Sequence, residues 1–261
     1  MKYAAKKVLN STIRARVGVS FSHHKGRCMQ KVSVLAALGL LSAAGAANAE
    51  VSATVTATND YIFRGITQSA EDPALQASVD YANESGWYIG AWGSNVDFGP
   101  GDPADLEVDV YTGFSGGAED GLGWDVGIVY YTYPDESDYN YPEIYGKISH
   151  GIFSGGLFYS NDWVNSGEDA MYVNAGVSVP FADAFSFNAG AGYSFGDAFD
   201  DTEYVDYSIG VGYTLGHFEM SLSWIDTDLD DGEALFSSDE VFNTEGRAVF
   251  TIATTFPWSA D

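Results

Sequence analysis

The chain has 261 residues, with 37 Asp and Glu against 11 Lys and Arg, and its formal net charge is −26. Hydrophobic residues make up 46% of it and aromatic residues 15%, so the acidity does not indicate a disordered chain. The charge argues against nucleic acid as a partner, because phosphate binding needs Lys and Arg.

The first 49 residues have the pattern of a secretory signal peptide. Eight of the 11 basic residues lie there, followed by the apolar run Val32–Leu41 and the A-x-A sequence Ala47–Ala49. The apolar run is too short for a membrane-spanning helix. We therefore expect cleavage after Ala49, and a single domain over residues 50–261. This segment keeps three basic residues and all 37 acids, a formal charge of −34. Cys28, the one cysteine of the chain, would be removed with the signal peptide, so residues 50–261 have no disulfide framework.

The stretch Phe185–Phe195 alternates apolar and small polar residues over its whole length. Such a period of two is the signature of a β-strand with two unlike faces. Similar alternation predicts twelve strands in chain order: Val51–Phe63, Ala74–Tyr81, Trp87–Asn95, Leu106–Ser115, Trp124–Tyr133, Glu143–His150, Gly155–Ser160, Ala170–Val179, Phe185–Phe195, Tyr204–Thr214, His217–Ile225 and Glu245–Phe256. About ten residues with apolar-out, polar-in alternation is the length that a tilted strand needs to cross a bilayer.

The connections between these strands alternate between long and short, and the first one is long. The six long connections hold 22 of the 37 acids. This rhythm is typical of an outer-membrane barrel with short periplasmic turns and longer extracellular loops. The sequence therefore predicts an all-β fold, an antiparallel transmembrane barrel of about 12 strands. Its outer loops are acidic and both of its termini are periplasmic.

Aromatic residues gather at the predicted strand ends on the apolar face, while small residues occupy the middle. We interpret these aromatic side chains as the two girdles at the membrane interfaces of a barrel, rather than as packing in a core. They are Tyr61, Phe63, Trp87, Trp124, Phe185, Tyr213, Phe218 and Trp224.

Charged residues on the polar face of the strands are candidates for lining the lumen. Inside a barrel, rings of like charge tune ion selectivity. The candidates are Asp80, Glu107, Asp109, Asp125, Glu143, Lys147, Asp206, Glu219, Glu245 and Arg247. We expect Lys147 and Arg247 to pair with nearby carboxylates, since an unpaired charge in a narrow barrel is costly. A closed polar network that only fills the lumen is the alternative.

The acidic run Asp226, Asp228, Asp230 and Asp231 is a weak calcium candidate, because several carboxylates can bind this ion. It does not match an EF-hand loop, since Asp231 stands at the sixth position and Ser237 at the twelfth. A solvated acidic loop is the preferred interpretation, and no firm metal site is predicted.

No catalytic residues and no cofactor are predicted. The glycine runs near Gly190 and Gly210 lie in strands with no helix after them, so they do not indicate a dinucleotide site. We interpret these inward glycines as relief of crowding. His217 and Ser221 share a strand face and suggest a hydrolase only weakly, because no orienting group or oxyanion site accompanies them.

Two segments resemble a known family over their motifs. They are Asn59–Ser69, NDYIFRGITQS, with Asp72–Gln76 after it, and Gly90–Gly99, GAWGSNVDFG. They resemble the TorF-type porin family of proteobacteria, also catalogued as a family of unknown function. The resemblance covers essentially all of residues 50–261, and it implies an outer-membrane barrel with a pore and no catalytic residues.

Together these patterns predict a porin-like channel for passive diffusion of small polar solutes or ions, with a preference for cations. A sealed structural or surface-binding barrel is the alternative, and an outer-membrane hydrolase is a more distant one. The predicted partners are outer-membrane lipid, the solutes and the barrel-insertion machinery, with no nucleic acid.

Overall fold

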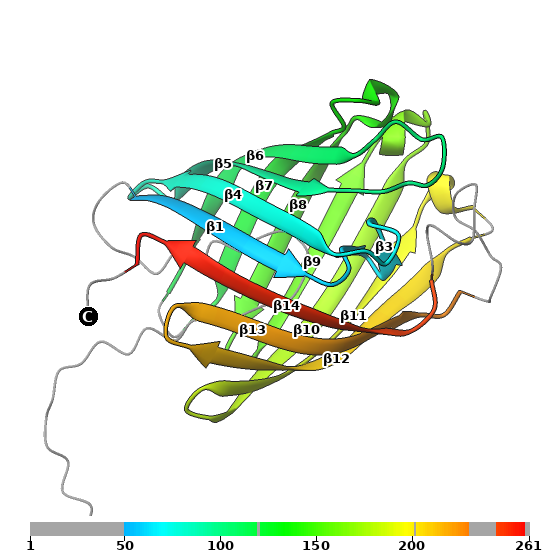
Figure 1. Cartoon of the computed structure of the whole chain (residues 1–261). Coiled ribbons are helices and arrows are strands. Elements are labelled where there is room, and N and C mark those ends of the chain that lie inside the picture. Colours follow the sequence, from blue (N-terminus) through cyan, green and yellow to red (C-terminus); the bar gives the residue numbers. More distant parts are fainter. Residues whose placement is uncertain (1–49, 119–120, 201, 230–243, 259–261) are drawn as a thin grey trace, which may run out of the picture. The chain divides into compact units, whose positions relative to one another are not determined.

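The computed structural model describes residues 50–118, 121–200, 202–229 and 244–258. Within these residues, twelve antiparallel strands close into a barrel in the order β1-β14-β13-β12-β11-β10-β9-β8-β7-β6-β5-β4 (Figure 1). The barrel strands are β1 (Glu50–Thr58), β4 (Ala74–Ala82), β5 (Trp87–Asn95), β6 (Leu106–Gly117), β7 (Gly123–Thr132), β8 (Tyr141–His150), β9 (Phe153–Ser160), β10 (Ala170–Ala182), β11 (Phe185–Phe195), β12 (Tyr204–Leu215), β13 (Phe218–Thr227) and β14 (Arg247–Phe256). The predicted all-β barrel is confirmed.

The period-two alternation sorts side chains between the outside and the inside of the barrel. Outward residues are apolar and exposed: Leu75 is 64% exposed, Ile144 54% and Leu222 57%. Their neighbours in sequence face inward and include most of the buried charged residues. An apolar surface of this extent around a closed sheet fits lipid rather than water.

The connections have the predicted rhythm. Turns of two to five residues join β4 to β5, β6 to β7, β8 to β9, β10 to β11 and β12 to β13 at one end of the barrel. Longer loops lie at the other end, and three of them contain 3₁₀ helices, Ser137–Tyr139, Trp163–Asn165 and Asp197–Phe199. Strand β1 begins and β14 ends at the short-turn end (Figure 1).

The structure corrects the first predicted strand. The barrel strand β1 ends at Thr58, and the chain then turns inward through β2 (Ile62–Phe63) and β3 (Ile66–Thr67), a separate two-stranded sheet. Tyr61 and Phe63 therefore do not belong to an outer girdle: Tyr61 is 4% exposed and packs inside the barrel. Smaller corrections are that β9 begins at Phe153 and that β14 begins at Arg247.

The remaining girdle residues lie on the outward parity of their strands. Trp124, Phe185, Phe218 and Trp224 are exposed, and Tyr213 stacks on Phe185 with ring centroids 4.6 Å apart.

Residues 1–49, with the predicted signal peptide, lie outside the described residues. None of the helices in the described part of the chain is long and apolar enough to cross a membrane.

Candidate functional site

The connection between β1 and β4 folds into the barrel instead of projecting from it. We call residues 59–73 the lumen hairpin, because β2 and β3 form its two short strands. It leaves β1 and reaches inward-facing residues of β8, β9, β10 and β12. Strands β9 and β10 lie half-way round the barrel from β1, so the hairpin crosses the lumen.

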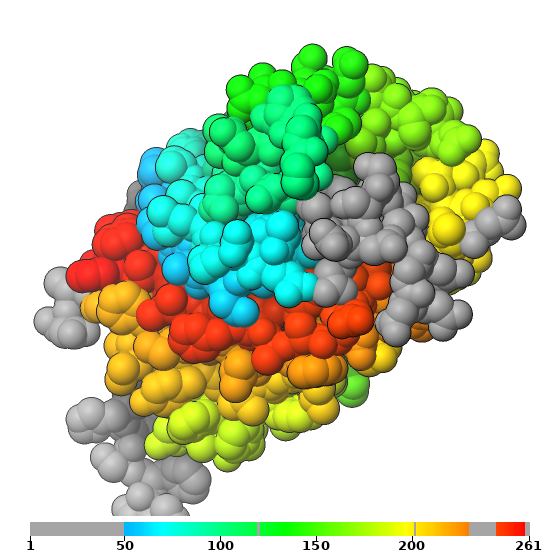
Figure 2. Space-filling view, turned by 45° about the vertical axis from the view of Figure 1, so that its right-hand side comes forward, coloured from blue at the N-terminus to red at the C-terminus, as the bar shows by residue number. Residues whose placement is uncertain are grey.

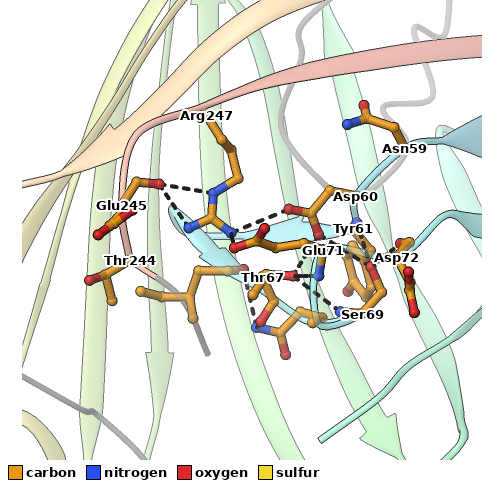
Figure 3. A network of polar contacts seen from close by, with 12 residues as sticks. Asn59, Asp60, Tyr61, Thr67, Ser69, Glu71, Asp72, Thr244, Glu245 and Arg247 are labelled. Atoms are coloured by element: carbon orange, nitrogen blue, oxygen red, sulfur yellow. Dashed lines mark hydrogen bonds and ion pairs between the residues drawn. The ribbon is translucent and has the colours of Figure 1, made fainter. Parts of the chain in front are cut away.

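The base of the lumen hairpin is held by Asp60, which is buried (Figure 3). Its Oδ1 accepts hydrogen bonds from the hydroxyls of Thr67 at 2.5 Å and Ser69 at 3.2 Å. Its Oδ2 lies 3.3 Å from Nη1 of Arg247 on β14. Burial raises the pKa of Asp60, while the Thr67 hydrogen bond and the Arg247 charge oppose this rise. One carboxylate thus fastens both arms of the hairpin to the barrel wall.

The tip of the lumen hairpin is held by Arg64. Its Nη2 lies 2.5 Å from Oε2 of Glu143 on β8, and both side chains are buried. The guanidinium also lies over two rings of the wall, 5.4 Å from the centre of Phe158 and 4.5 Å from that of Tyr172. The backbone oxygen of Arg64 accepts a hydrogen bond from the Tyr204 hydroxyl at 2.9 Å. These contacts fix the tip against the far wall.

The turn at the tip needs a glycine. Arg64 and Gly65 both have positive φ, 49° and 84°, as a two-residue turn between antiparallel strands demands. A Cβ on Gly65 would lie 2.6 Å from Cγ2 of Thr227 and 2.8 Å from Cβ of Asp206. Only a residue without a side chain lets the hairpin approach β12 and β13 this closely.

Aromatic side chains pack on both sides of the lumen hairpin. On one side Tyr61 lies edge-on to Trp92 and Phe63 lies edge-on to Tyr131. On the other side Ile66 packs in a buried cluster with Phe199. At the long-loop end, the cyan residues near the hairpin lie between green residues around position 100 and orange-red β14 (Figure 2).

Tyrosines on the inner wall lie flat across glycines of the adjacent strand. A Cβ on each of these glycines would collide with the tyrosine ring or hydroxyl. The pairs are Tyr111 on Gly90, Tyr88 on Gly113, Tyr145 on Gly127 and Tyr172 on Gly192. The expected relief of crowding by inward glycines therefore has a specific form: the glycines let large rings lie along the wall.

The hydroxyls of three of these tyrosines reach predicted lumen acids. Tyr111 donates to Asp80, Tyr88 donates to Asp125 at 2.6 Å and Tyr172 donates to Asp206 at 3.2 Å. A further tyrosine, Tyr131, donates to Glu143 at 3.1 Å. Four of the predicted acids thus belong to tyrosine–carboxylate pairs on the wall.

The other predicted lumen residues differ in their surroundings. Glu107 and Asp109 are buried, and Glu107 Oε2 and Asp109 Oδ1 have no hydrogen-bond partner within the described residues. Lys147 lies 3.8 Å from Asp125 and over the ring of Tyr145, so both predicted basic residues of the lumen pair with acids. Glu219 is exposed near the short-turn end. Glu245 precedes β14, outside the strand in which it was predicted.

The inner wall differs from one half of the barrel to the other. Along β5–β8 the inward side chains are mostly buried, and they include Tyr88, Tyr111, Tyr131 and Glu143. Along β10–β12 the inward residues nearer the long loops, Tyr172, Ser194 and Tyr204, are also buried, but those nearer the short turns are small and half-exposed. These half-exposed residues are Asn174, Gly176, Ser178, Ser186, Asn188, Gly190, Ser208, Gly210 and Gly212. Side chains therefore do not fill the lumen along the part of β10–β12 that lies nearer the short turns.

The calcium and hydrolase alternatives receive no geometric support. Asp226 accepts a hydrogen bond from Thr227 N and Asp228 from Val205 N, while Asp230 and Asp231 lie outside the described residues. Within the described residues, no group of three or more potential ligands could hold a metal ion. His217 stacks on Trp258, and four residues of strand, about 13 Å, separate it from Ser221. That separation is too long for a nucleophile–base pair.

Sequence reasoning missed the residues that occupy the lumen from the first loop. Tyr61 and Arg64 were not predicted as lumen residues, although Arg64 is one of only three basic residues after position 49. That scarcity, together with the adjacent Gly65, is the signal that could have identified the tip.

Comparisons with known proteins agree with the barrel. A family model described as "Bacterial protein of unknown function (Gcw_chp)" matches residues 42–256. A solved structure of the KdgM porin in complex with disordered oligogalacturonate is 6% identical, with a TM-score of 0.50, covering 80% of this chain and 100% of that one. The NanC porin is 10% identical, with a TM-score of 0.51 and the same coverage. At such identities the likeness shows the fold alone. No curated protein is significantly similar in sequence.

Proposed function

The chain belongs to Gcw_chp, a bacterial family of unknown function, and from its structure we propose that it is a porin-like channel of the outer membrane. The channel would carry small polar solutes or ions by passive diffusion. Its apolar outer band would contact outer-membrane lipid after assembly by the barrel-insertion machinery. The short-turn end, where β1 begins and β14 ends, would face the periplasm.

One observation carries this proposal: the inward residues of β10–β12 nearer the short turns are small, uncharged and half-exposed. A barrel built only as a scaffold would be expected to fill this space with side chains, as β5–β8 do. The hydroxyl, amide and backbone groups of these half-exposed residues offer hydrogen bonds to a passing solute without a fixed charge. We place the diffusion path along this wall.

The lumen hairpin would be the constriction of this path. It crosses the lumen between two anchored ends, Asp60 at the base and Arg64 at the tip. Its position on the long-loop side means that a solute entering from outside meets it first. The conductance of the channel should therefore depend on how firmly the tip is held.

A preference for cations would arise in the outer loops more than in the lumen acids. Glu107, Asp109 and Glu143 are buried and do not face a solvated path. In contrast, Asp97, Asp105 and Asp135 and many other acids of the long loops are exposed. The electrostatic field of these exposed acids would accumulate cations at the entrance and repel anions. The basic residues Arg64, Lys147 and Arg247 each pair with an acid within the described residues.

The test is a planar-bilayer recording of the refolded protein across a salt gradient. We expect discrete conductance steps with a reversal potential on the cation-selective side. A folded protein that inserts but produces no steps would contradict the channel.

That outcome would favour the second candidate, a sealed barrel. The rings around the lumen hairpin, including Tyr61 against Trp92 and Phe63 against Tyr131, are the observation that favours it. In a sealed barrel the acidic loops would be the functional surface. We propose no enzymatic activity, and saturable ester hydrolysis lost in His217→Ala would contradict this.

A further inference from the structure

The Arg64 side chain fits into a site on the barrel wall as a ligand would. Glu143 supplies a carboxylate oxygen, and Phe158 and Tyr172 supply two ring faces within 6 Å of the guanidinium carbon. We call these three wall residues the cation box. A buried carboxylate with flanking rings has the chemistry that recognises guanidinium and ammonium groups.

The cation box is held together by wall contacts that do not involve the lumen hairpin. Tyr131 donates to Oε1 of Glu143, and the Asp206 carboxylate accepts from the Tyr172 hydroxyl. The rings of Phe158 and Tyr172 contact each other, with centroids 5.8 Å apart. The box should therefore keep its shape when the Arg64 side chain is absent, which is the requirement for preorganised binding.

Arg64 itself uses the cation box only in part. It meets Glu143 through Nη2 alone, and its Nη1 has no hydrogen-bond partner within the described residues. The tether to the hairpin backbone fixes the direction from which the guanidinium enters. A free guanidinium is not bound by this constraint and can turn to satisfy more of its donors.

We propose that the cation box is a binding site for the guanidinium or ammonium group of a diffusing solute, with Arg64 as its built-in occupant. This assignment rests on the proposed channel and names its solute class. A solute would enter the box by displacing Arg64, and the hairpin tip would then lose its main anchor on the wall. Solute binding and widening of the constriction would thus be one event.

Competition with Arg64 sets the expected affinity in the native protein. A tethered group acts at an effective concentration of about millimolar, so a free solute competes only at comparable concentrations. Removing the tethered competitor should expose the intrinsic affinity of the box. Arg64→Ala should therefore bind free guanidinium at least about tenfold more tightly than the native protein does.

The experiment is calorimetric titration of guanidinium chloride at low-millimolar concentrations into detergent-purified protein, with potassium chloride as the control salt. We expect saturable binding to Arg64→Ala, in a one-to-one ratio, and no saturable response to potassium. Adding Glu143→Gln to this variant should weaken guanidinium binding at least about tenfold, because the box loses its charge. Adding Glu219→Gln, an exposed acid far along the barrel, should leave binding unchanged.

The proposal is wrong if Arg64→Ala shows no saturable binding, or if Glu143→Gln and Glu219→Gln affect binding equally. If Arg64→Ala refolds poorly, the refolded fraction with guanidinium, compared with potassium at equal ionic strength, becomes the readout. Guanidinium should raise that fraction, and equal fractions would overturn the proposal.

The binding result is separable from the channel itself. Guanidinium binding to Arg64→Ala in a protein that never conducts would keep the site and refute the channel. Conductance in a protein whose variant binds no guanidinium would keep the channel and refute the site.

Discussion

Tyr172 shows how single residues shape the lumen. Its ring lies across Gly192 of the adjacent strand, its hydroxyl donates to Asp206 and its face contacts the Arg64 guanidinium. The glycine provides the room, the acid fixes the direction and the ring becomes part of the cation box. A tyrosine of this kind lines the wall rather than blocking the lumen.

Gly192→Ala should push the Tyr172 ring away from the wall, because a Cβ at this position collides with it. We expect a loss of about 1–3 kcal/mol in the free energy of unfolding, as for other overpacked sites. Single-channel conductance should fall as well, since the displaced ring enters the lumen. Urea unfolding in detergent and bilayer recording measure the two effects.

Gly146→Ala is the matched control for this substitution. Gly146 faces outward on β8, and its Cβ would meet only Cγ1 of Val126, at 4.0 Å. Its effect on stability should stay within about 0.5 kcal/mol. Equal losses in the two variants would contradict the account of the wall.

Tyr139 gives a pH-dependent test in the long loops. Its hydroxyl donates to Asp102 at 2.6 Å, and this hydrogen bond, with some burial, raises the pKa of Tyr139 from 10 to about 12. The folded loops hold the phenol proton more tightly than the unfolded chain does. Their stabilisation is therefore complete below pH 10 and is lost as the pH rises towards about 12.

The measurement is tyrosinate absorbance of the native protein minus that of Tyr139→Phe. The difference titration should centre near pH 12. A difference curve centred near pH 10 would show that the Asp102 contact does not form.

The sequence predicts the existence of the inward glycines but not their pairing with tyrosines. Alternation places Gly90, Gly113 and Gly192 on the inner face directly. Which ring covers which glycine depends on strand register and on the tilt of the side chains, and neither follows from a single sequence.

At the scale of elements, the lumen hairpin is the place where sequence and structure differ most. Tyr61 and Phe63 continue the apolar parity of β1, so the alternation predicts an unbroken strand up to Phe63. The chain instead leaves the barrel wall after Thr58 and turns into the lumen, because Asp60 buries its carboxylate among Thr67, Ser69 and Arg247. These contacts involve residues up to 187 positions away and cannot be read from local periodicity.

Glu143→Gln should release the tip of the lumen hairpin. Removing one partner of a buried ion pair leaves the other charge uncompensated, at a cost of about 3–5 kcal/mol. Because the hairpin can swing away, we expect this cost to appear as local opening. Amide hydrogen exchange across residues 61–68 should become at least about tenfold faster.

Glu219→Gln is the control, since Glu219 is exposed near the opposite end of the barrel. Exchange in the hairpin should match that of the native protein. Unchanged exchange in Glu143→Gln would mean that Arg64 does not anchor the tip.

At the scale of the whole molecule, the barrel follows from patterns that act locally. Period-two alternation and alternating connection lengths predict the closed sheet, and the positions of the acids predict its acidic outer loops. The predicted role of the lumen acids in ion selectivity agrees less well with the structure. Asp80 and Asp206 accept hydrogen bonds from tyrosines, and Glu107 and Asp109 are buried, so their exposure depends on tertiary packing.

The charge of the whole loop end predicts a salt-dependent selectivity. The Debye length falls from about 8 Å at physiological ionic strength to about 3 Å at 1 M, so the field of exposed acids weakens. The cation-to-anion permeability ratio should decrease as salt rises. It should also decrease in a variant with Asp97, Asp105 and Asp135 changed to Asn, and change less in Glu107→Gln. A larger decrease of the permeability ratio in Glu107→Gln than in the loop variant would show that the lumen acids determine the selectivity.

The proposed channel, with the lumen hairpin as its constriction, is tested by comparing single-channel conductance of the native protein with that of Arg64→Ala under the same salt gradient. We expect small cation-selective steps from the native protein. We expect larger steps from Arg64→Ala, because the constriction loses its anchor while the half-exposed wall of β10–β12 stays open. Silent bilayers for both folded proteins, or steps of equal size, would contradict this proposal.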